Sequence, residues 1–398
     1  MTVLEVFQWT LRAAAYSVTA YVVFVAALTI PFLQNQVIYL NFATQTWGMD
    51  LDVPEQWGFL RNQVTPFSIA TRDGETLQAW HILPLELYRR YEEKLISESS
   101  GHVDDVTSRW GFHLLRDDPN ALLVIYLHGA GGTLSSGWRP ASYRGLYSGA
   151  SDRIHTVAID YRGFGRSTGK SSEDGLLTDA ETLVDWAMNV AGIPASRIVI
   201  FGQSLGTAVS VSLACHMASR PTPVLFAGMV LVAPLSDVET LTATYRVAGL
   251  IPILSPVAYF PTLLKVLNSF IRSKWPSKDK IAELIRICEA SKDQHARYHI
   301  TIIHAEDDTD IPWNHSDLLY WHAVNASQPT GISYEAFEEE KERNKKHVGA
   351  AGWTVEFPAR KGVVREEIIK YGVHDKIMSY PVVSLAVLRA FQSASMSS

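Results

Sequence analysis

Residues 198–206 read IVIFGQSLG, and they join a short apolar run to the helical stretch Leu205 to Ala218. A Gly-x-Ser-x-Gly pattern between a strand and a helix predicts a turn so sharp that only small side chains fit beside the serine. It places the Ser204 hydroxyl at the N-terminus of the helix. The bare pattern occurs often by chance, so the strand–turn–helix context is what favours a functional serine.

Short apolar runs alternate with amphipathic stretches on both sides of this segment. Runs without polar alternation must be covered on both faces, as in a mostly parallel sheet flanked by helices. An Asp-Gly hairpin joining Val64–Thr71 to Thr76–Leu83 precedes them. The sequence therefore predicts an α/β fold. The runs are Leu122–Leu127, Thr156–Ile159, Ile198–Phe201, Met229–Val232 and Ile300–Ile303, and the covering helices include Leu176–Val190.

A reactive serine needs a base and an acid that orients the base, and in this strand–turn–helix setting both follow it in the chain. Three aspartates follow the run Ile300–Ile303. Asp308 is favoured because it lies four residues before Pro312 in an Asp-x-x-Ile-Pro turn. Asp307 and Asp310 remain alternatives, and as ordinary turn residues they would cap backbone amides.

The predicted base is His374, which lies on a glycine-containing loop just before the last amphipathic stretch, Pro381–Phe391. His315 lies too close to the acid turn, and His347 lies in a lysine-rich insertion. The order serine, aspartate, histidine is the one that this arrangement requires.

The run ending at Leu127 continues as HGAGG, residues 128–132. Acyl transfer needs backbone N–H groups aimed at the developing oxyanion, and Ala130 and Leu205 are the predicted donors. His128 is predicted to be a structural hydrogen-bonding residue. The spacing of dinucleotide-binding and phosphate-binding loops is missing. Only Cys215 and Cys288 occur in the chain, which gives no disulfide framework and no paired-thiolate metal site. A mechanism based on a serine, a histidine and an aspartate implies no metal and no organic cofactor.

No charged residue occurs between Arg12 and Asp50, and Ala13–Leu33 is almost continuously apolar. This length suffices for about 20 residues across a bilayer, whereas the apolar core of a signal peptide has about 7–15. A buried helix of a soluble domain is the other alternative. We predict a single-pass anchor over residues 1–40, with a cytosolic N-terminus and a lumenal catalytic domain. Two glycosylation sequons can test this orientation, and Asn325 is preferred over Asn314.

The remaining 41–398 are predicted to form one catalytic domain with insertions at 84–112, 243–289 and 328–352. The insertion at 243–289 is apolar and broken by prolines between Leu250 and Phe270, which is typical of a cap over the sheet edge. The net charge of −6 is spread along the chain without a basic stripe, so a nucleic-acid partner is not expected. The sequence does not indicate an oligomeric state.

Together with DYRGFGRS at 160–167, these motifs make the region from Leu122 to Phe391 resemble the α/β-hydrolase superfamily. The apolar N-terminus, the hairpin with Trp80-His81 and the HAEDD turn at 304–308 resemble the alpha/beta-hydrolase domain-containing protein twelve family. That resemblance implies an integral membrane lipase of the endoplasmic reticulum, acting on lysophospholipids or monoacylglycerols. Ser204, Asp308 and His374 match its triad position by position. The charged insertion Tyr334–Lys346 and the segment Trp353–Ile369 depart from it and leave the last strand's register open.

The expected function is hydrolysis of carboxylic esters through an acyl-enzyme on Ser204, with lipid esters at a membrane as the favoured substrates. A thioesterase that removes palmitoyl groups and a serine peptidase would use the same triad. A non-catalytic binding protein of the same fold is a third alternative, because a fold does not imply a function.

Overall fold

The structure, a computed structural model, describes residues 2–43, 46, 48–244, 246–247, 251–252 and 254–395. Leu250 and Ile253, which belong to the apolar part of the predicted cap, lie outside the described residues.

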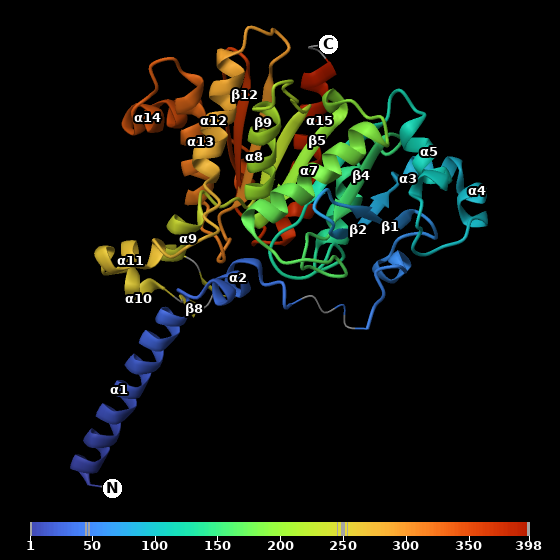
Figure 1. The fold of residues 1–398 in the computed structure, drawn as a ribbon. Helices are drawn as coiled ribbons and strands as arrows, with labels where there is room; N and C mark the ends of the chain where they lie inside the picture. The colour runs from blue at the N-terminus through green and yellow to red at the C-terminus, as the bar shows by residue number, and fades with distance from the viewer. Residues whose placement is uncertain are drawn as a thin grey trace.

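A twisted sheet forms the centre of the molecule and has ten strands in the described part of the chain (Figure 1). Five of its contacts are parallel, from β4 through to β12, and antiparallel strands are added at both edges. The prediction of a mostly parallel sheet that an antiparallel hairpin precedes in the chain is confirmed. In spatial order the strands are β1 (Val64–Ala70), β2 (Thr76–Ile82), β4 (Ile154–Ile159), β3 (Leu122–Leu127), β5 (Ile198–Gln203), β6 (Gly228–Val232), β9 (Tyr298–Ala305), β12 (Gly362–Ile369), β11 (Gly352–Pro358) and β10 (Lys346–His347).

Helices cover both faces of this sheet, so the apolar strands are buried on both sides. In β3, Leu123 and Ile125 join one core and Val124 and Tyr126 join the other, because successive side chains point to opposite faces. Figure 1 shows α7 and α8 in front of the sheet and α15 behind it. The first core is covered by α7 (Glu173–Asn189), α8 (Leu205–Ala218), α12 (Ser277–Ala290) and α13 (Asn314–Ser327), and the second by α6 (Arg139–Leu146) and α15 (Pro381–Ser395).

The last parallel strand, whose register the sequence left open, is β12. It pairs with β9 from Gly362 opposite Tyr298 to Ile369 opposite Ala305. The segment before it folds back as β11 and β10, which extend the sheet edge. The insertion at 328–352 contains α14 (Tyr334–Asn344), and that at 84–112 contains α3 (Leu85–Arg90), α4 (Glu92–Ser97) and the start of α5 (Trp110–Arg116).

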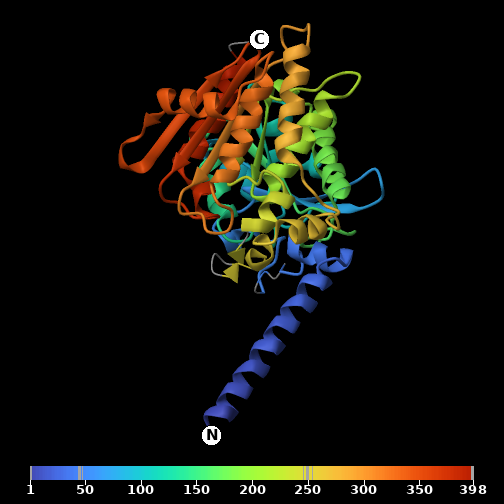
Figure 2. The same cartoon turned by 90° about the vertical axis from the view of Figure 1, so that its left-hand side faces the viewer.

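The predicted cap range, 243–289, contains two kinds of structure. Its second half is α12, which packs against α8 and α13 as part of the core. Its first half holds the short pair β7 (Arg246–Val247) and β8 (Ile251–Pro252), followed by α10 (Ser255–Ala258) and α11 (Pro261–Asn268); α9 (Val238–Thr244) leads into it. Figures 1 and 2 place α10 and α11 on the side of the domain from which the N-terminal helix projects.

The N-terminal apolar stretch forms two helices, α1 (Val3–Ala27) and α2 (Pro31–Tyr39). The apolar stretch Ala13–Leu33 within the predicted anchor is therefore not one helix, since α1 ends before the last residues of that stretch. Pro31 lacks a backbone N–H and begins a new helix at its first position, which ends the apolar helix before it. No residue of α1 is buried, whereas α2 packs on the domain that contains the sheet: the Gln34 side chain donates to the Phe270 carbonyl at 2.9 Å.

Candidate active site

Ser204 lies in the sharp turn between β5 and α8 and has φ 53° and ψ −122°. A non-glycine residue rarely adopts such a backbone conformation, and it persists where the surrounding structure enforces it. The Ser204 amide donates to the Val232 carbonyl of β6 at 2.9 Å. A Cβ atom at Gly202 would collide with the Gly206 carbonyl, and one at Gly206 would collide with the Leu127 carbonyl. Both glycines are therefore required for β5, the turn and α8 to pack this closely.

His374 joins Ser204 to Asp308. Its Nε2 lies 2.8 Å from Ser204 Oγ, and its Nδ1 lies 2.7 Å from Asp308 Oδ2. The three residues follow β5, β9 and β12, whose carboxyl ends meet at one edge of the sheet. The carboxylate accepts the Nδ1 proton, so Nε2 is left to accept the serine proton. The structure thus brings together the three residues predicted as nucleophile, acid and base.

Asp308 is held by more partners than the sequence indicated. Its Oδ1 accepts the amides of Asp310 at 2.9 Å and Ile311 at 3.0 Å. Its Oδ2 lies 3.0 Å from His304 Nε2, which is also 2.9 Å from the Ile311 carbonyl. A carbonyl can only accept, so His304 Nε2 carries the proton and donates to Asp308. Burial opposes the charge of Asp308, but the hydrogen bonds from His304 and His374 hold its pKa well below the usual value.

His304 was missed as a functional residue, although it opens the HAEDD turn that carries the family resemblance. Its other ring nitrogen, Nδ1, accepts the Ser316 hydroxyl at 2.6 Å. The only signal in the sequence was its position at the end of an apolar run, four residues before the acid. That signal does not distinguish a ring that orients the acid from a core histidine.

The residues considered as alternatives to Asp308 and His374 lie elsewhere in the structure. Asp307 Oδ1 accepts the amides of Gly372 and Val373, both at 2.8 Å, and so holds the loop that carries His374. Asp310 lines the cavity next to the serine. His315 is buried with Nδ1 2.9 Å from Ser236 Oγ, and His347 lies exposed in β10.

The loop after β3 approaches the serine closely enough to serve as an oxyanion site. A Cβ atom at Gly129 would lie 3.0 Å from Ser204 Cβ. Ala130 follows directly, and both Ala130 and Leu205 line the cavity at the serine. Among the described residues, neither the Ala130 nor the Leu205 amide donates to a protein acceptor. Both N–H groups are therefore free to bind an oxyanion.

Two further contacts fix this loop, and the sequence indicated neither of them. The buried Arg139 guanidinium donates to the carbonyls of Gly129 at 3.0 Å and Gly131 at 2.9 Å. From the other side, the Gly131 amide donates to the Tyr39 carbonyl at 2.8 Å. His128, the first residue of the loop, is fully buried, and its Nε2 lies 3.3 Å from Asp160 Oδ1. This position is that of a structural residue.

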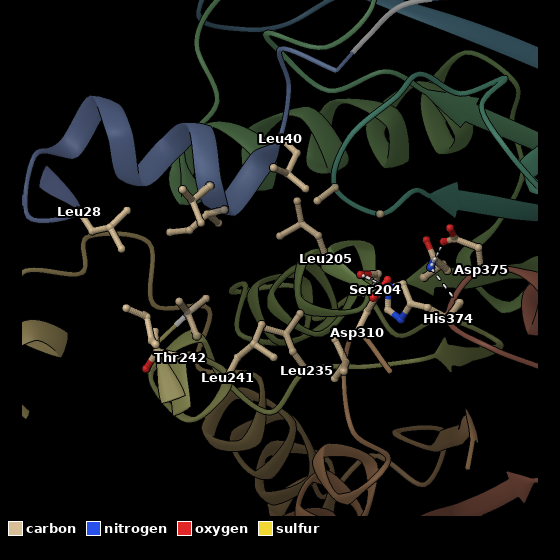
Figure 3. A pocket seen from close by; sticks show the side chains of 18 residues that line it. Leu28, Leu40, Ser204, Leu205, Leu235, Leu241, Thr242, Asp310, His374 and Asp375 are labelled. Atoms are coloured by element: carbon tan, nitrogen blue, oxygen red, sulfur yellow. Dashed lines mark hydrogen bonds between the residues drawn. The ribbon is translucent and has the colours of Figure 1, made fainter. Parts of the chain in front are cut away.

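A cavity of about 320 Å³ extends from the triad to the end of α1 (Figure 3). In Figure 3, Leu28 lies at one end and Ser204 and His374 at the other, with leucine side chains between them. Asp310 and Asp375 lie at the triad end. The remaining apolar lining residues are Val37, Ile38, Leu40, Leu205, Leu235, Val238, Leu241, Leu254 and Ile311.

In the part of the chain that the structure describes, no three His, Cys, Asp or Glu side chains are grouped so that they could hold a metal ion. Cys215 and Cys288 are both buried and free.

The mostly parallel sheet flanked by helices and the arrangement of Ser204, His374 and Asp308 are those of an α/β hydrolase. Comparison with known proteins agrees with this class. The model of the alpha/beta hydrolase family matches residues 124–327, and the chain belongs to that family. A crystal structure of an alpha-beta hydrolase from Vibrio vulnificus superposes with a TM-score of 0.53 at 16% identity, covering 92% of this chain and 94% of that one. The predicted α/β-hydrolase fold is confirmed.

Within the family, the chain is similar to the ABHD12 group. Lysophosphatidylserine lipase ABHD12 of Danio rerio is 26% identical over 302 residues, 76% of this chain and 69% of that protein. Protein ABHD12B of Homo sapiens is 30% identical over 302 residues, 74% and 70% of the two chains. In the Mus musculus ABHD12 protein the match covers 63% of the length. The resemblance predicted from the motifs is confirmed, and this chain spans about two thirds of its relatives.

Proposed function

We propose that the protein is a serine hydrolase that cleaves lipid esters carrying a single acyl chain. One observation carries the proposal: the hydrogen-bonded series Asp308, His374 and Ser204 opens into an apolar cavity. Ser204 Oγ attacks the ester carbonyl carbon while His374 Nε2 takes its proton. The amides of Ala130 and Leu205 hold the oxyanion, and His374 then returns the proton to the leaving alcohol. Water activated by His374 releases the acid and restores Ser204.

The shape and lining of the cavity support a monoacyl substrate. Its volume, about 320 Å³, lies at the low end of the roughly 300–1,000 Å³ typical of small-molecule sites. Its apolar walls stabilise an acyl chain by about 0.8 kcal/mol for each buried CH₂ group. Asp310 and Asp375 at the triad end favour a head group that is neutral or bears an ammonium. The name of the zebrafish relative, a lysophosphatidylserine lipase, agrees with a single-chain lipid.

The substrate class is tested with the purified full-length protein and a panel of lipids. We expect monoacylglycerol and lysophosphatidylcholine to be cleaved faster than diacylphosphatidylcholine, and Ser204→Ala to cleave none of them. Lipid profiling of membranes carrying wild-type or Ser204→Ala protein then identifies the natural ester. Faster cleavage of a palmitoyl thioester or a peptide would replace the lipase proposal. A well-folded wild-type protein that a fluorophosphonate probe does not label would contradict hydrolysis altogether.

The pH dependence of turnover reports on the base. Burial opposes protonation of His374, but its hydrogen bond to Asp308 and the charge of that carboxylate outweigh burial and raise the pKa of His374. Only neutral imidazole can accept the serine proton, and the neutral fraction grows as the pH rises. We therefore expect kcat/KM for a soluble activated ester to rise with pH through a limb centred above 6.5, the free imidazole value. A limb at or below 6.5 would contradict this coupling.

We propose that α1 anchors the protein in a bilayer. It is the one described helix long and apolar enough to cross a membrane. Its 25 residues extend about 37 Å at 1.5 Å per residue, against a hydrocarbon core of about 30 Å. In water its exposed aliphatic and aromatic side chains would form an unusually large apolar surface.

The proposed orientation, with the catalytic domain in the lumen of the endoplasmic reticulum, is tested by glycosylation. The structure reverses the preference between the two sequons. Asn325 is half-buried in α13 and its Oδ1 accepts the Ile332 amide at 2.7 Å, whereas Asn314 is exposed at the start of that helix. In a eukaryotic host we expect endoglycosidase to shift the gel mobility and Asn314→Gln to remove the shift. Digestion of the domain by protease added to sealed microsomes, with no glycan shift, would place it in the cytosol.

A further inference from the structure

The side of the domain from which α1 projects carries a cluster of exposed apolar side chains that the core does not use. Between Arg246 and Arg272 the only charged residue is Lys265. Leu263 and Val266 on α11, and Phe270 just past its end, follow one another at helical spacing and are 51%, 52% and 50% exposed. We call the whole cluster the α11 patch: Ile30, Phe32, Tyr259, Phe260, Leu263, Val266 and Phe270, each at least half exposed.

Contacts within the chain place this patch at the level of α1. The Tyr21 hydroxyl lies close to the backbone of Val257 in α10. Tyr21 precedes the end of α1 at Ala27 by six residues, which is about 9 Å along a helix. The Phe270 carbonyl accepts the Gln34 side chain of α2 at 2.9 Å. The helices α10 and α11 are therefore held beside the last turns of α1, as Figures 1 and 2 also show.

The proposed anchor would put the patch at the depth of a helix that lies in a membrane interface. Interfacial amphipathic helices bury their apolar face about 5–10 Å into the boundary between head groups and acyl chains. A bilayer crossed by α1 and containing Tyr21 would reach α10 at that depth. Lys265 can extend its ammonium group towards the head groups while its aliphatic stem stays among apolar atoms.

The cavity reaches the same level. Leu28, the residue that caps α1, and Leu254, which precedes α10, both line the cavity that reaches Ser204. An acyl chain that leaves the bilayer between α1 and α10 would pass from lipid into an apolar wall without crossing water.

We propose that the α11 patch is a second membrane-contact surface, which lies in the leaflet that α1 enters and opens the acyl cavity directly to lipid. This inference rests on the proposed anchor and lipase function. The occupant is a phospholipid bilayer, because the patch is continuous with α1 and is apolar and aromatic with a single cation. A protein partner is the alternative that the experiment separates.

Membrane contact is measured on the full chain in nanodiscs that contain brominated phosphatidylcholine. The native Cys215 and Cys288 are buried, so a bimane label reacts with an introduced cysteine. We expect Val266→Cys to be quenched as Val23→Cys in α1 is. The matched control, Leu385→Cys in α15, should not be quenched, although Leu385 is 48% and Val266 is 52% exposed. Quenching at Val23 but not at Val266 overturns this inference, and no quenching at Val23 contradicts the anchor instead.

A second measurement separates membrane contact from the fold and the chemistry. The triple substitution Leu263→Ser, Val266→Ser and Phe270→Ser alters none of the residues that line the cavity. We expect it to slow hydrolysis of monoacylglycerol in vesicles by about tenfold, because three buried apolar contacts with lipid are lost. Cleavage of a short-chain, water-soluble ester should stay unchanged. An equal loss on both esters, or no loss on either, overturns the inference; a wild-type protein that cleaves neither contradicts the proposed function.

Discussion

Replacing Ser204 by alanine is expected to lower turnover of an activated ester by at least about 10³-fold while leaving the protein folded. The loss follows because the Oγ atom 2.8 Å from His374 Nε2 is the only nucleophile that the triad can activate. His374→Ala should cost about as much, since the two residues act as one unit. The residual rate would come from substrate binding and from the Ala130 and Leu205 amides.

A matched control separates loss of the nucleophile from damage to α8. Ser212 lies two turns along the same helix and has the same 9% exposure as Ser204. We expect Ser212→Ala to retain turnover close to wild type, with thermal unfolding of both variants near that of the parent. Turnover by Ser204→Ala within a factor of ten of wild type would remove Ser204 as nucleophile.

The sequence was most informative where a local pattern determines the structure. The turn at Ser204 needs glycine on both sides because the backbones of β3, β5 and α8 meet there. The Gly-x-Ser-x-Gly pattern shows this requirement in the sequence. The strands buried on both faces appear as uninterrupted apolar runs. Asp308 could be chosen because it follows a predicted strand end, and His374 because it lies on a glycine-containing loop just before the last amphipathic stretch; both come in the required order.

Long-range contacts were not predictable in the same way. The Gly131 amide donates to the Tyr39 carbonyl, and the Arg139 guanidinium donates to carbonyls of the loop after β3. The periodicity of apolar residues in the sequence does not indicate such long-range pairs. The edge strands β10 and β11 were missed because β10 has only two residues and β11 is partly exposed, so neither shows the uninterrupted apolar signal of the central strands. The end of α1 was misplaced because hydropathy continues past Pro31, whereas the helical hydrogen-bond pattern does not.

The acid of the triad can be distinguished from its neighbour with a pair of substitutions of equal size. Asp308→Asn should lower turnover by about 10³- to 10⁴-fold, because an amide that donates to His374 Nδ1 stabilises the wrong tautomer of the base. Without the Asp308 carboxylate, only the charges of Asp375 and Asp310 still oppose the effect of burial, so the pKa of His374 falls and the residual activity should extend to lower pH. The measurement is kcat/KM against pH with a soluble ester.

Asp307→Asn is the control for the same turn. The asparagine keeps an oxygen that can accept the Gly372 and Val373 amides, the two bonds that hold the His374 loop. We therefore expect a loss of less than about tenfold, since the acceptor geometry is retained and a neutral acceptor weakens each bond only modestly. Asp307→Ala removes the acceptor and should cost more than Asp307→Asn. Greater damage from Asp307→Asn than from Asp308→Asn would assign the acid to Asp307, because only the residue that sets the tautomer of His374 is that sensitive to an exchange of oxygen for NH₂.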